Sequence, residues 1–244
     1  MILLRLLRVF LHLFSGLWTC ATIFPRTDHA GRNVRIQRWS IKLLTICGVE
    51  VEISHADPAQ PPQHALIVAN HVSWLDVFVI NAVEPCRFVA KSDIRNWPLI
   101  GWLCDKAGTV FIARGKQRDV RRIYQGLVTS IRDGERIAFF PEGTTVGQGT
   151  LLPFHANLFE AAIDAVPVRP YALRYLDQDG QLHGAVDFVG DMSFAQSMIT
   201  ILKAGRITAQ LVSLPLIDSS NTDRRELAQA ARNAIAAALG HPND

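Results

Sequence analysis

Residues 70–76 read Asn-His-Val-Ser-Trp-Leu-Asp, and two of them are able to form an acid–base pair. His71 can take a proton from a hydroxyl group, while a carboxylate such as Asp76 holds the imidazole in one tautomer and stabilises the imidazolium. A structural explanation fits the same letters. Ser73 followed three residues later by Asp76 is the pattern of a helix N-cap, with a helix over about 74–82 and His71 in the loop before it. These seven residues alone leave both interpretations open.

Other polar residues follow predicted strands. Short apolar runs at 65–69, 108–112 and 136–140 are typical of buried strands. Asn70-His71 comes after the first run, Arg114 after the second, and Pro141-Glu142-Gly143-Thr144 after the third. Ligand sites in open α/β sheets collect at the carboxyl ends of the strands, so we expect these groups to lie near one another.

Several common chemistries lack their sequence signals here. There is no G-x-S-x-G or S-x-x-K nucleophile motif, no H-E-x-x-H metal motif, and no G-x-x-x-x-G-K-[ST] or G-x-G-x-x-G nucleotide loop. What remains is His71 with a nearby carboxylate, a Glu-Gly turn, and the isolated cations Lys91 and Arg114. A base without a nucleophile favours direct acyl transfer to a hydroxyl, with no covalent enzyme intermediate, no metal and no cofactor.

Five motifs in order carry a resemblance to a known family. They are Asn-His-x-Ser-x-x-Asp (70–76), Lys followed by Pro-x-x-Gly (91–101), Gly-x-x-Phe-Ile-x-Arg (108–114), Phe-Pro-Glu-Gly-Thr (140–144) and Val-Pro-Val-x-Pro (166–170). Together they resemble the glycerolipid acyltransferase family, typified by 1-acylglycerol-3-phosphate acyltransferases. The resemblance covers about residues 64–190, roughly half of the chain.

The resemblance implies a role for each matching residue. His71 is then the general base and Asp76 its orienting carboxylate, which capping of the following helix would help to fix. Lys91 and Arg114 are implied ligands of an anionic headgroup, and Glu142, Gly143 and Thr144 form the acceptor-binding turn. The structural alternatives are solvated surface charges and a plain turn. His155 also precedes a glutamate by five residues, but we interpret it as a bystander at a helix start.

The implied reaction moves a fatty acyl chain from a thioester, acyl-CoA or acyl carrier protein, to the free hydroxyl of a lysolipid. One departure bears on the acceptor. Phosphatidate-forming members usually carry Arg after Phe-Pro-Glu-Gly-Thr, whereas this chain has Thr145. An arginine is a bidentate phosphate ligand, so its replacement keeps two acceptors open. 1-Acylglycerol-3-phosphate is the first and lyso-ornithine lipid the second.

The basic charge of the chain is concentrated at its N-terminus. Residues 1–48 hold seven Lys or Arg against one Asp, although the whole chain has a net charge of +3. This distribution favours an anionic membrane surface over a nucleic-acid partner. Polar residues among the first 24 recur every three or four positions, which predicts an amphipathic helix, and a second follows at about 34–47. We expect this 1–48 segment to lie on the cytoplasmic face of the inner membrane, as a peripheral or monotopic anchor, with a single membrane-spanning helix as the alternative. A non-enzymatic lipid-binding protein would use the same helices.

The remaining residues, 49–244, predict a single α/β domain with a mixed sheet flanked by helices. Its chain is long enough for a substantial core, and four widely spaced cysteines fit packing positions in a reducing compartment. The Pro-rich stretch 57–62 is expected to be a loop, and 177–180 a turn. Strands are predicted at 49–53, 65–69, 86–90, 108–112, 136–140, 166–173, 184–189 and 207–213. Helices are predicted at 117–132, 156–165, 195–204 and 222–239.

Overall fold

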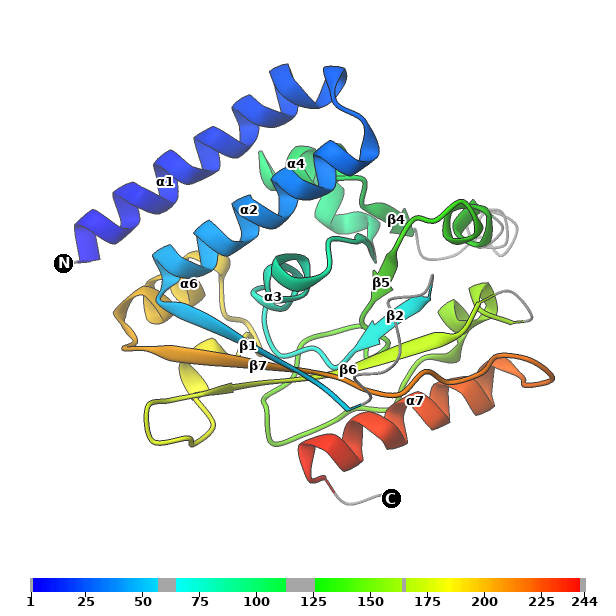
Figure 1. Ribbon diagram of the computed structural model, residues 1–244. Helices are drawn as coiled ribbons and strands as arrows, with labels where there is room; N and C mark the ends of the chain where they lie inside the picture. The colour runs from blue at the N-terminus through cyan, green and yellow to red at the C-terminus, as the bar shows by residue number, and fades with distance from the viewer. Residues whose placement is uncertain (1, 57–64, 113–125, 164–165, 242–244) are drawn as a thin grey trace.

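A seven-stranded mixed sheet forms the centre of the protein (Figure 1). The computed structural model describes residues 2–56, 65–112, 126–163 and 166–241. The sheet order is β1-β7-β6-β2-β5-β3-β4, and β6 pairs antiparallel with β7 while the other neighbours are parallel. The strands are β1 (Val49–His55), β2 (Leu66–Ala69), β3 (Arg87–Lys91), β4 (Val110–Ile112), β5 (Ile137–Phe139), β6 (Val168–Leu176) and β7 (Ile207–Ser213). The predicted mixed α/β sheet is confirmed.

Helices cover both faces of the sheet. In Figure 1, α1, α2 and α3 lie on one side and α7 on the other. The α-helices are α1 (Ile2–Trp18), α2 (His29–Cys47), α3 (Asp76–Val83), α4 (Ile100–Lys106), α6 (Phe194–Lys203) and α7 (Arg224–Leu239). Shorter turns of helix are η1 (Thr19–Ile23), η2 (Phe24–Arg26), η3 (Ser92–Asn96), η4 (Ala156–Ala161) and η5 (Gly184–Val186), and residues 126–132 are also helical.

Strand β2 shows how the sequence builds two cores. Successive side chains of a strand point to opposite faces, and all four residues of β2 are buried. Ile67 and Ala69 join a core with α2, α3 and α6, whereas Leu66 and Val68 join a core with α7. A strand buried on both faces must be apolar throughout, which is why 65–69 carries no alternation. This central strand delivers Asn70 and His71 at its carboxyl end.

Seven of the eight predicted strands are present within a few residues of the expected bounds. The strand expected at 184–189 is wrong, because Gly184–Val186 forms a 3-10 turn in which the His183 side chain accepts a hydrogen bond from the Ala185 amide at 3.3 Å. Its apolar Val186 is buried in the core from a turn rather than from a strand. The helix expected at 156–165 is a shorter 3-10 helix, Ala156–Ala161. Residues 57–62 and most of 117–132 lie outside the described residues.

The N-terminal helix α1 turns its polar contacts inward and its apolar side outward. Arg5 donates to the Leu202 carbonyl of α6 at 2.9 Å. His12 Nε2 lies 2.9 Å from the Trp39 carbonyl of α2, and the two rings stack with centroids 4.4 Å apart. The exposed side of α1 carries large apolar residues: Leu3, Leu4, Leu7, Phe10, Leu11, Phe14 and Trp18. A surface helix of a soluble protein has the reverse arrangement.

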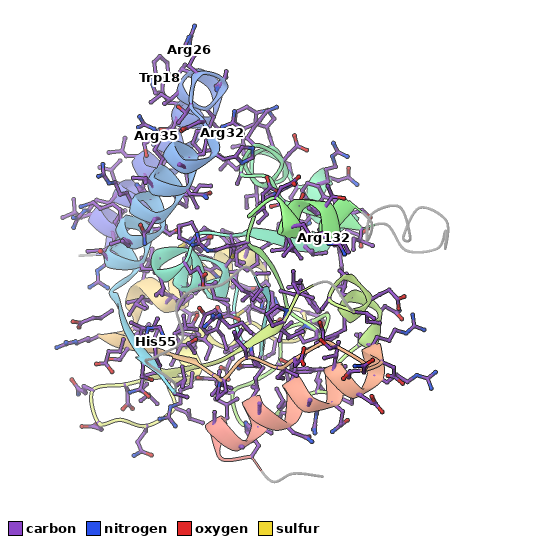
Figure 2. All side chains as sticks on the ribbon, turned by 45° about the vertical axis from the view of Figure 1, so that its right-hand side comes forward. Trp18, Arg26, Arg32, Arg35, His55 and Arg132 are labelled. Carbon is purple, nitrogen blue, oxygen red and sulfur yellow. The ribbon has the colours of Figure 1, made fainter. Side chains whose placement is uncertain are left out.

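Helix α2 begins earlier than the predicted residue 34, because the Asp28 side chain caps it by accepting from the Gly31 amide at 2.9 Å. Figure 2 shows Trp18, Arg26, Arg32 and Arg35 at the end of the two-helix segment where α1 joins α2. Arg32 donates to the Phe24 and Thr27 carbonyls and so holds this connection closed. Leu43, Leu44 and Ile46 of α2 are buried in the same core as the sheet residues.

The four cysteines are free, and burial raises the pKa of the Cys47 thiol to about 12.

Gly48 ends α2 in the left-handed conformation, with φ of 80°, and its amide donates to the Leu44 and Thr45 carbonyls. We therefore expect Gly48→Ala to lower the free energy of unfolding by about 1–2 kcal/mol, because a side chain strains this conformation. Gly205→Ala is the matched control, since a Cβ there meets nothing within 4 Å. Urea denaturation in mild detergent measures both. Equal stability of the two variants would contradict the assignment of Gly48 as a required left-handed cap.

Candidate active site

The carboxyl ends of three neighbouring strands bring the predicted site residues together. His71 follows β2 by two residues, Glu142 follows β5, and Lys91 is the last residue of β3. These strands lie in the order β2-β5-β3 and run parallel, so their ends share one edge of the sheet. Asn70 continues the pairing of β2 with β6 through its side chain. The side-chain amide of Asn70 donates to the Leu173 carbonyl and accepts from the Leu173 backbone amide, each at 2.8 Å. The loop that carries His71 is thereby fixed to the sheet.

His71 and Asp76 form a hydrogen-bonded pair. His71 Nδ1 lies 2.8 Å from Asp76 Oδ2, and the Asp76 side chain is fully buried. A carboxylate only accepts, so Nδ1 carries the proton and Nε2 keeps a free lone pair. The imidazole also stacks on Phe140, with centroids 3.9 Å apart and planes 7° from parallel. The arrangement has the geometry of a general base held by an orienting carboxylate.

The helix cap predicted from Ser73 is wrong. Ser73 does not bind the first amides of the helix, and the Asp76 side chain binds amides of the loop before it. Helix α3 begins at Asp76 after Leu75, with no side-chain cap, and Ser73 Oγ is buried with no partner among the described residues. Asp76 Oδ2 instead accepts from the Val72 amide at 2.7 Å and the Ser73 amide at 3.0 Å. The carboxylate folds back over the loop because it satisfies these buried amides while also reaching His71. One side chain therefore orders the loop and orients the imidazole.

Glu142 ties the same loop to the turn after β5. Its carboxylate accepts from the His71 amide at 2.7 Å through Oε1 and from the Leu152 amide at 2.9 Å through Oε2. Burial raises the pKa of this carboxyl, and the two backbone hydrogen bonds oppose the rise. Because both oxygens are engaged with the backbone, the geometry gives Glu142 a role in holding the site. The acceptor-binding role implied by the family resemblance stays a prediction.

A cavity of about 530 Å³ is lined by Lys91, Glu142, Gly143, Thr144 and His155. It adjoins His71 because Glu142 lines it and binds the His71 amide. Gly143 has a φ of 69°, and a Cβ there would lie 3.2 Å from His155 Cδ2. The backbone conformation favours glycine at this position, and any side chain would also push the His155 imidazole aside by a few tenths of an ångström. Three predicted acceptor-binding residues and Lys91 therefore share one cavity.

Three further residues from the sequence analysis remain to be placed. His155, interpreted as a bystander, does lie at the start of η4, but its side chain lines the cavity. The Thr145 hydroxyl donates to the Phe188 carbonyl, so the Thr145 side chain is bound to the loop that follows η5. Arg114 lies outside the described residues.

Sequence reasoning missed Tyr175, whose hydroxyl donates to Asp76 Oδ1 at 2.7 Å. It lies 99 positions from Asp76 on β6, and no local spacing signals such a contact. Only knowledge that β6 neighbours β2 would have placed it there. Within the described ranges, no group of three or more His, Cys, Asp or Glu side chains is placed to hold a metal ion.

Comparison with known proteins identifies the family. The sequence profile of the family described as Acyltransferase matches residues 50–174. A lyso-ornithine lipid O-acyltransferase of Pseudomonas aeruginosa is 38% identical over 88% of this chain and 82% of its own length. A 1-acyl-sn-glycerol-3-phosphate acyltransferase of Neisseria meningitidis is 33% identical over 87% of this chain and 84% of its own length. The crystal structure of PlsC, the 1-acyl-sn-glycerophosphate acyltransferase from Thermotoga maritima, has a similar fold. It superposes with a TM-score of 0.65 at 18% identity, over 98% of this chain and 97% of that one. The resemblance carried by the five motifs is thus confirmed, and the chain belongs to the acyltransferase family.

Proposed function

We propose that this lysolipid acyltransferase deprotonates the acceptor hydroxyl with His71, oriented by Asp76. The observation that carries the proposal is the 2.8 Å contact between His71 Nδ1 and a fully buried carboxylate. Family membership decides against the non-enzymatic lipid-binding alternative, since the matched relatives are named as acyltransferases. The acyl donor is a thioester, acyl-CoA or acyl carrier protein, and serves as a co-substrate.

The chemistry follows from the free lone pair on Nε2. His71 removes the proton of the lysolipid hydroxyl as its oxygen attacks the thioester carbonyl carbon. The tetrahedral intermediate then expels the thiolate, and the imidazolium of His71 gives this thiolate its proton. The products are an ester and a thiol, and the enzyme is unchanged. The Asp76 carboxylate stabilises the imidazolium between these two steps. In this scheme no enzyme nucleophile forms a covalent bond.

For the acceptor we propose 1-acylglycerol-3-phosphate, with its phosphate bound in the cavity by Lys91 and by the turn at Gly143 and Thr144. The similarity to the Neisseria enzyme supports this choice. Lyso-ornithine lipid is the second candidate. It is favoured by Thr145, which offers no charge where an arginine would bind phosphate, and by the similarity to the Pseudomonas enzyme. Both lipids present a free hydroxyl, so the same base serves either.

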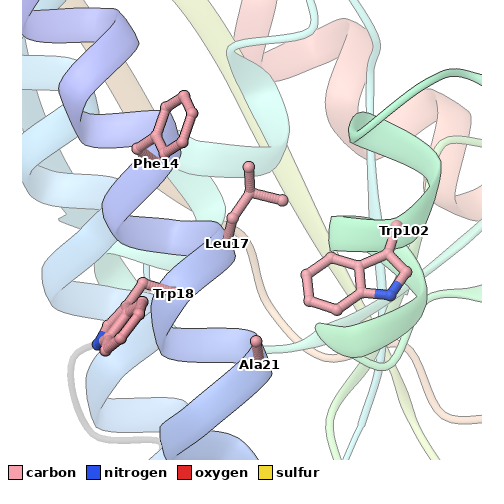
Figure 3. A pocket seen from close by; sticks show the side chains of 5 residues that line it. All are labelled: Phe14, Leu17, Trp18, Ala21 and Trp102. Atoms are coloured by element: carbon pink, nitrogen blue, oxygen red, sulfur yellow. The ribbon is translucent and has the colours of Figure 1, made fainter.

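We further propose that α1 lies within the bilayer surface. It continues through η1 and η2, and the stretch Ile2–Arg26 is long and apolar enough to cross a membrane. Yet it is held against other helices along its length. Arg5 donates to the Leu202 carbonyl of α6, and His12 stacks on Trp39 of α2. Farther along, an apolar groove of about 340 Å³ opens between α1 and Trp102 of α4 (Figure 3). A helix that crossed the bilayer would leave the body at one end, whereas this one runs alongside it. Its exposed leucine and phenylalanine side chains then enter the lipid.

His71→Ala should leave a folded protein whose turnover is about 10²–10⁴-fold lower, because it lacks the base. Asp76→Asn should lose a similar factor, since the amide cannot stabilise an imidazolium. Labelled acyl donor with a lysolipid acceptor measures turnover, and circular dichroism confirms folding. Near-normal turnover by folded His71→Ala would overturn the mechanism, and full activity of Asp76→Asn would reduce the pair to a structural contact.

Thr145→Arg should separate the two acceptors. A phosphate monoester carries close to two negative charges at neutral pH, so an added arginine should leave activity on 1-acylglycerol-3-phosphate unchanged or higher. The same cation should repel the ammonium group of an ornithine headgroup and lower activity on that lipid. Thr145→Val is the control, because it removes the hydroxyl bond to Phe188 without adding charge. Competition between both lipids is measured for all three proteins. Strong preference of the unmodified enzyme for lyso-ornithine lipid would reverse our choice.

The membrane proposal predicts that Leu7→Glu combined with Phe14→Glu weakens binding to anionic vesicles by at least about ten-fold, because charges must then leave water or lift α1. Ile53→Glu is the control on β1, because Ile53 is an exposed apolar side chain that does not belong to α1. Vesicle flotation measures binding. Equal flotation of the double variant and the control would show that the outer face of α1 does not enter lipid.

A further inference from the structure

Tyr175 holds the one oxygen of Asp76 that His71 does not use. Its hydroxyl donates to Asp76 Oδ1 at 2.7 Å, and both side chains are fully buried. His71, Val72 and Ser73 all bind the other oxygen, Oδ2. Among the described residues, Tyr175 is therefore the donor assigned to Oδ1. A buried carboxylate oxygen without a donor is costly, so this contact has consequences for the whole pair.

The Tyr175 hydroxyl keeps its proton whenever the enzyme works. Burial, the negative charge of Asp76 and the hydrogen bond to it all raise the pKa of this phenol well above its ordinary value. Facing a group that only accepts, the protonated phenol must donate.

The position of Tyr175 is itself fixed by the sheet. It pairs with Ala209 of β7 in the antiparallel ladder, and its amide donates to the Gln148 side chain at 2.6 Å. The Tyr175 hydroxyl is thus held by strand β6, whereas His71 and Asp76 belong to the loop after β2 and the start of α3.

We infer that Tyr175 is a positioning residue for the reaction, because it anchors Asp76 Oδ1 so that Oδ2 stays directed at His71 Nδ1. It also draws part of the negative charge of the carboxylate away from His71, which eases release of the proton from the imidazolium. This inference rests on the proposed base role of His71. Tyr175 binds the carboxylate and does not contact substrate.

Two other titratable groups interact with the pair but do not bind Tyr175. Glu142, in the turn after β5, interacts electrostatically with His71 and Asp76, and Asp187, after η5, interacts with Asp76. Since neither is hydrogen-bonded to Tyr175 in the described contacts, a change in the pH profile of a Tyr175 variant reports on the Tyr175–Asp76 bond.

Tyr175→Phe tests the inference, and Tyr171→Phe is its matched control. Tyr171 lies on the same strand, is also buried, and donates its hydroxyl to Glu84 Oε2 at 2.6 Å. Both variants should lower the melting temperature by a similar amount, about 2–6 °C. Only Tyr175→Phe should lower kcat, by about ten-fold with KM within two-fold. It should also move the acidic limb of the pH–rate profile about half a unit higher, because a carboxylate without the phenol holds the imidazolium more strongly.

Unchanged kcat and pH profile in Tyr175→Phe would overturn the inference, as would an equal change in Tyr171→Phe. If Tyr175→Phe is too unstable to assay, the same substitution is made in Asp76→Asn, which has no buried charge to satisfy. There it should change kcat less than two-fold, and a further ten-fold loss would contradict an action through Asp76. His71→Ala is assayed beside them. Turnover retained by that variant defeats the mechanism itself, whereas its loss together with a normal Tyr175→Phe defeats only the present inference.

Discussion

A buried carboxylate that must be satisfied from every side organises this molecule. Asp76 is fully buried at the start of α3, and its two oxygens accept four hydrogen bonds, from three consecutive residues of one loop and from β6. An unpaired charge in such a place would cost several kcal/mol, so the loop after β2 and the strand beside it are constrained to fixed positions. Glu142 has a similar role, because its carboxylate accepts hydrogen bonds from the His71 and Leu152 amides. In this site, carboxyl side chains accept the hydrogen bonds that the loop amides would otherwise lack.

The sequence predicts the parts of this arrangement that depend on local pattern. Apolar runs such as 65–69 predict strands that are buried on both faces. A polar residue directly after such a run is expected at the edge of the sheet where the parallel strands end. His71 and Glu142 are placed in this way, whereas Lys91 follows from the family resemblance. Local pattern misleads where two structures share one signature. Ser73 and Asp76 have the spacing of a helix cap, but burial of the Val72 and Ser73 amides makes the carboxylate serve the preceding loop. Residues 184–189 contain Val186 and Phe188 as a strand would, but Val186 enters the core from a 3-10 turn.

Contacts between distant segments were beyond such reasoning. Tyr175 and Asp76 meet because β6 is the neighbour of β2, a fact of sheet order rather than of spacing. His155 enters the cavity because its amide binds the Pro141 carbonyl and so brings it against Gly143. The periodicity of α1 predicted an amphipathic helix but not which side faces the body. Arg5 and His12 find backbone carbonyls of α6 and α2, and this leaves the apolar side outward.

The stacking of α2 on α3 links the N-terminal segment to His71, the proposed base. Gln37 of α2 donates to the Ala82 and Val83 carbonyls at the end of α3, and Trp39 packs against Phe78. Helix α3 begins at Asp76, so a series of direct contacts runs from the two-helix segment to the residue that is hydrogen-bonded to His71. With α1 resting in a bilayer, such a coupling sets the height of the imidazole above the lipid surface. An acceptor would then be selected by how far its hydroxyl stands from the acyl chains, as well as by its headgroup. Lysolipids with unrelated headgroups but hydroxyls at the same height would be alternative substrates of one scaffold.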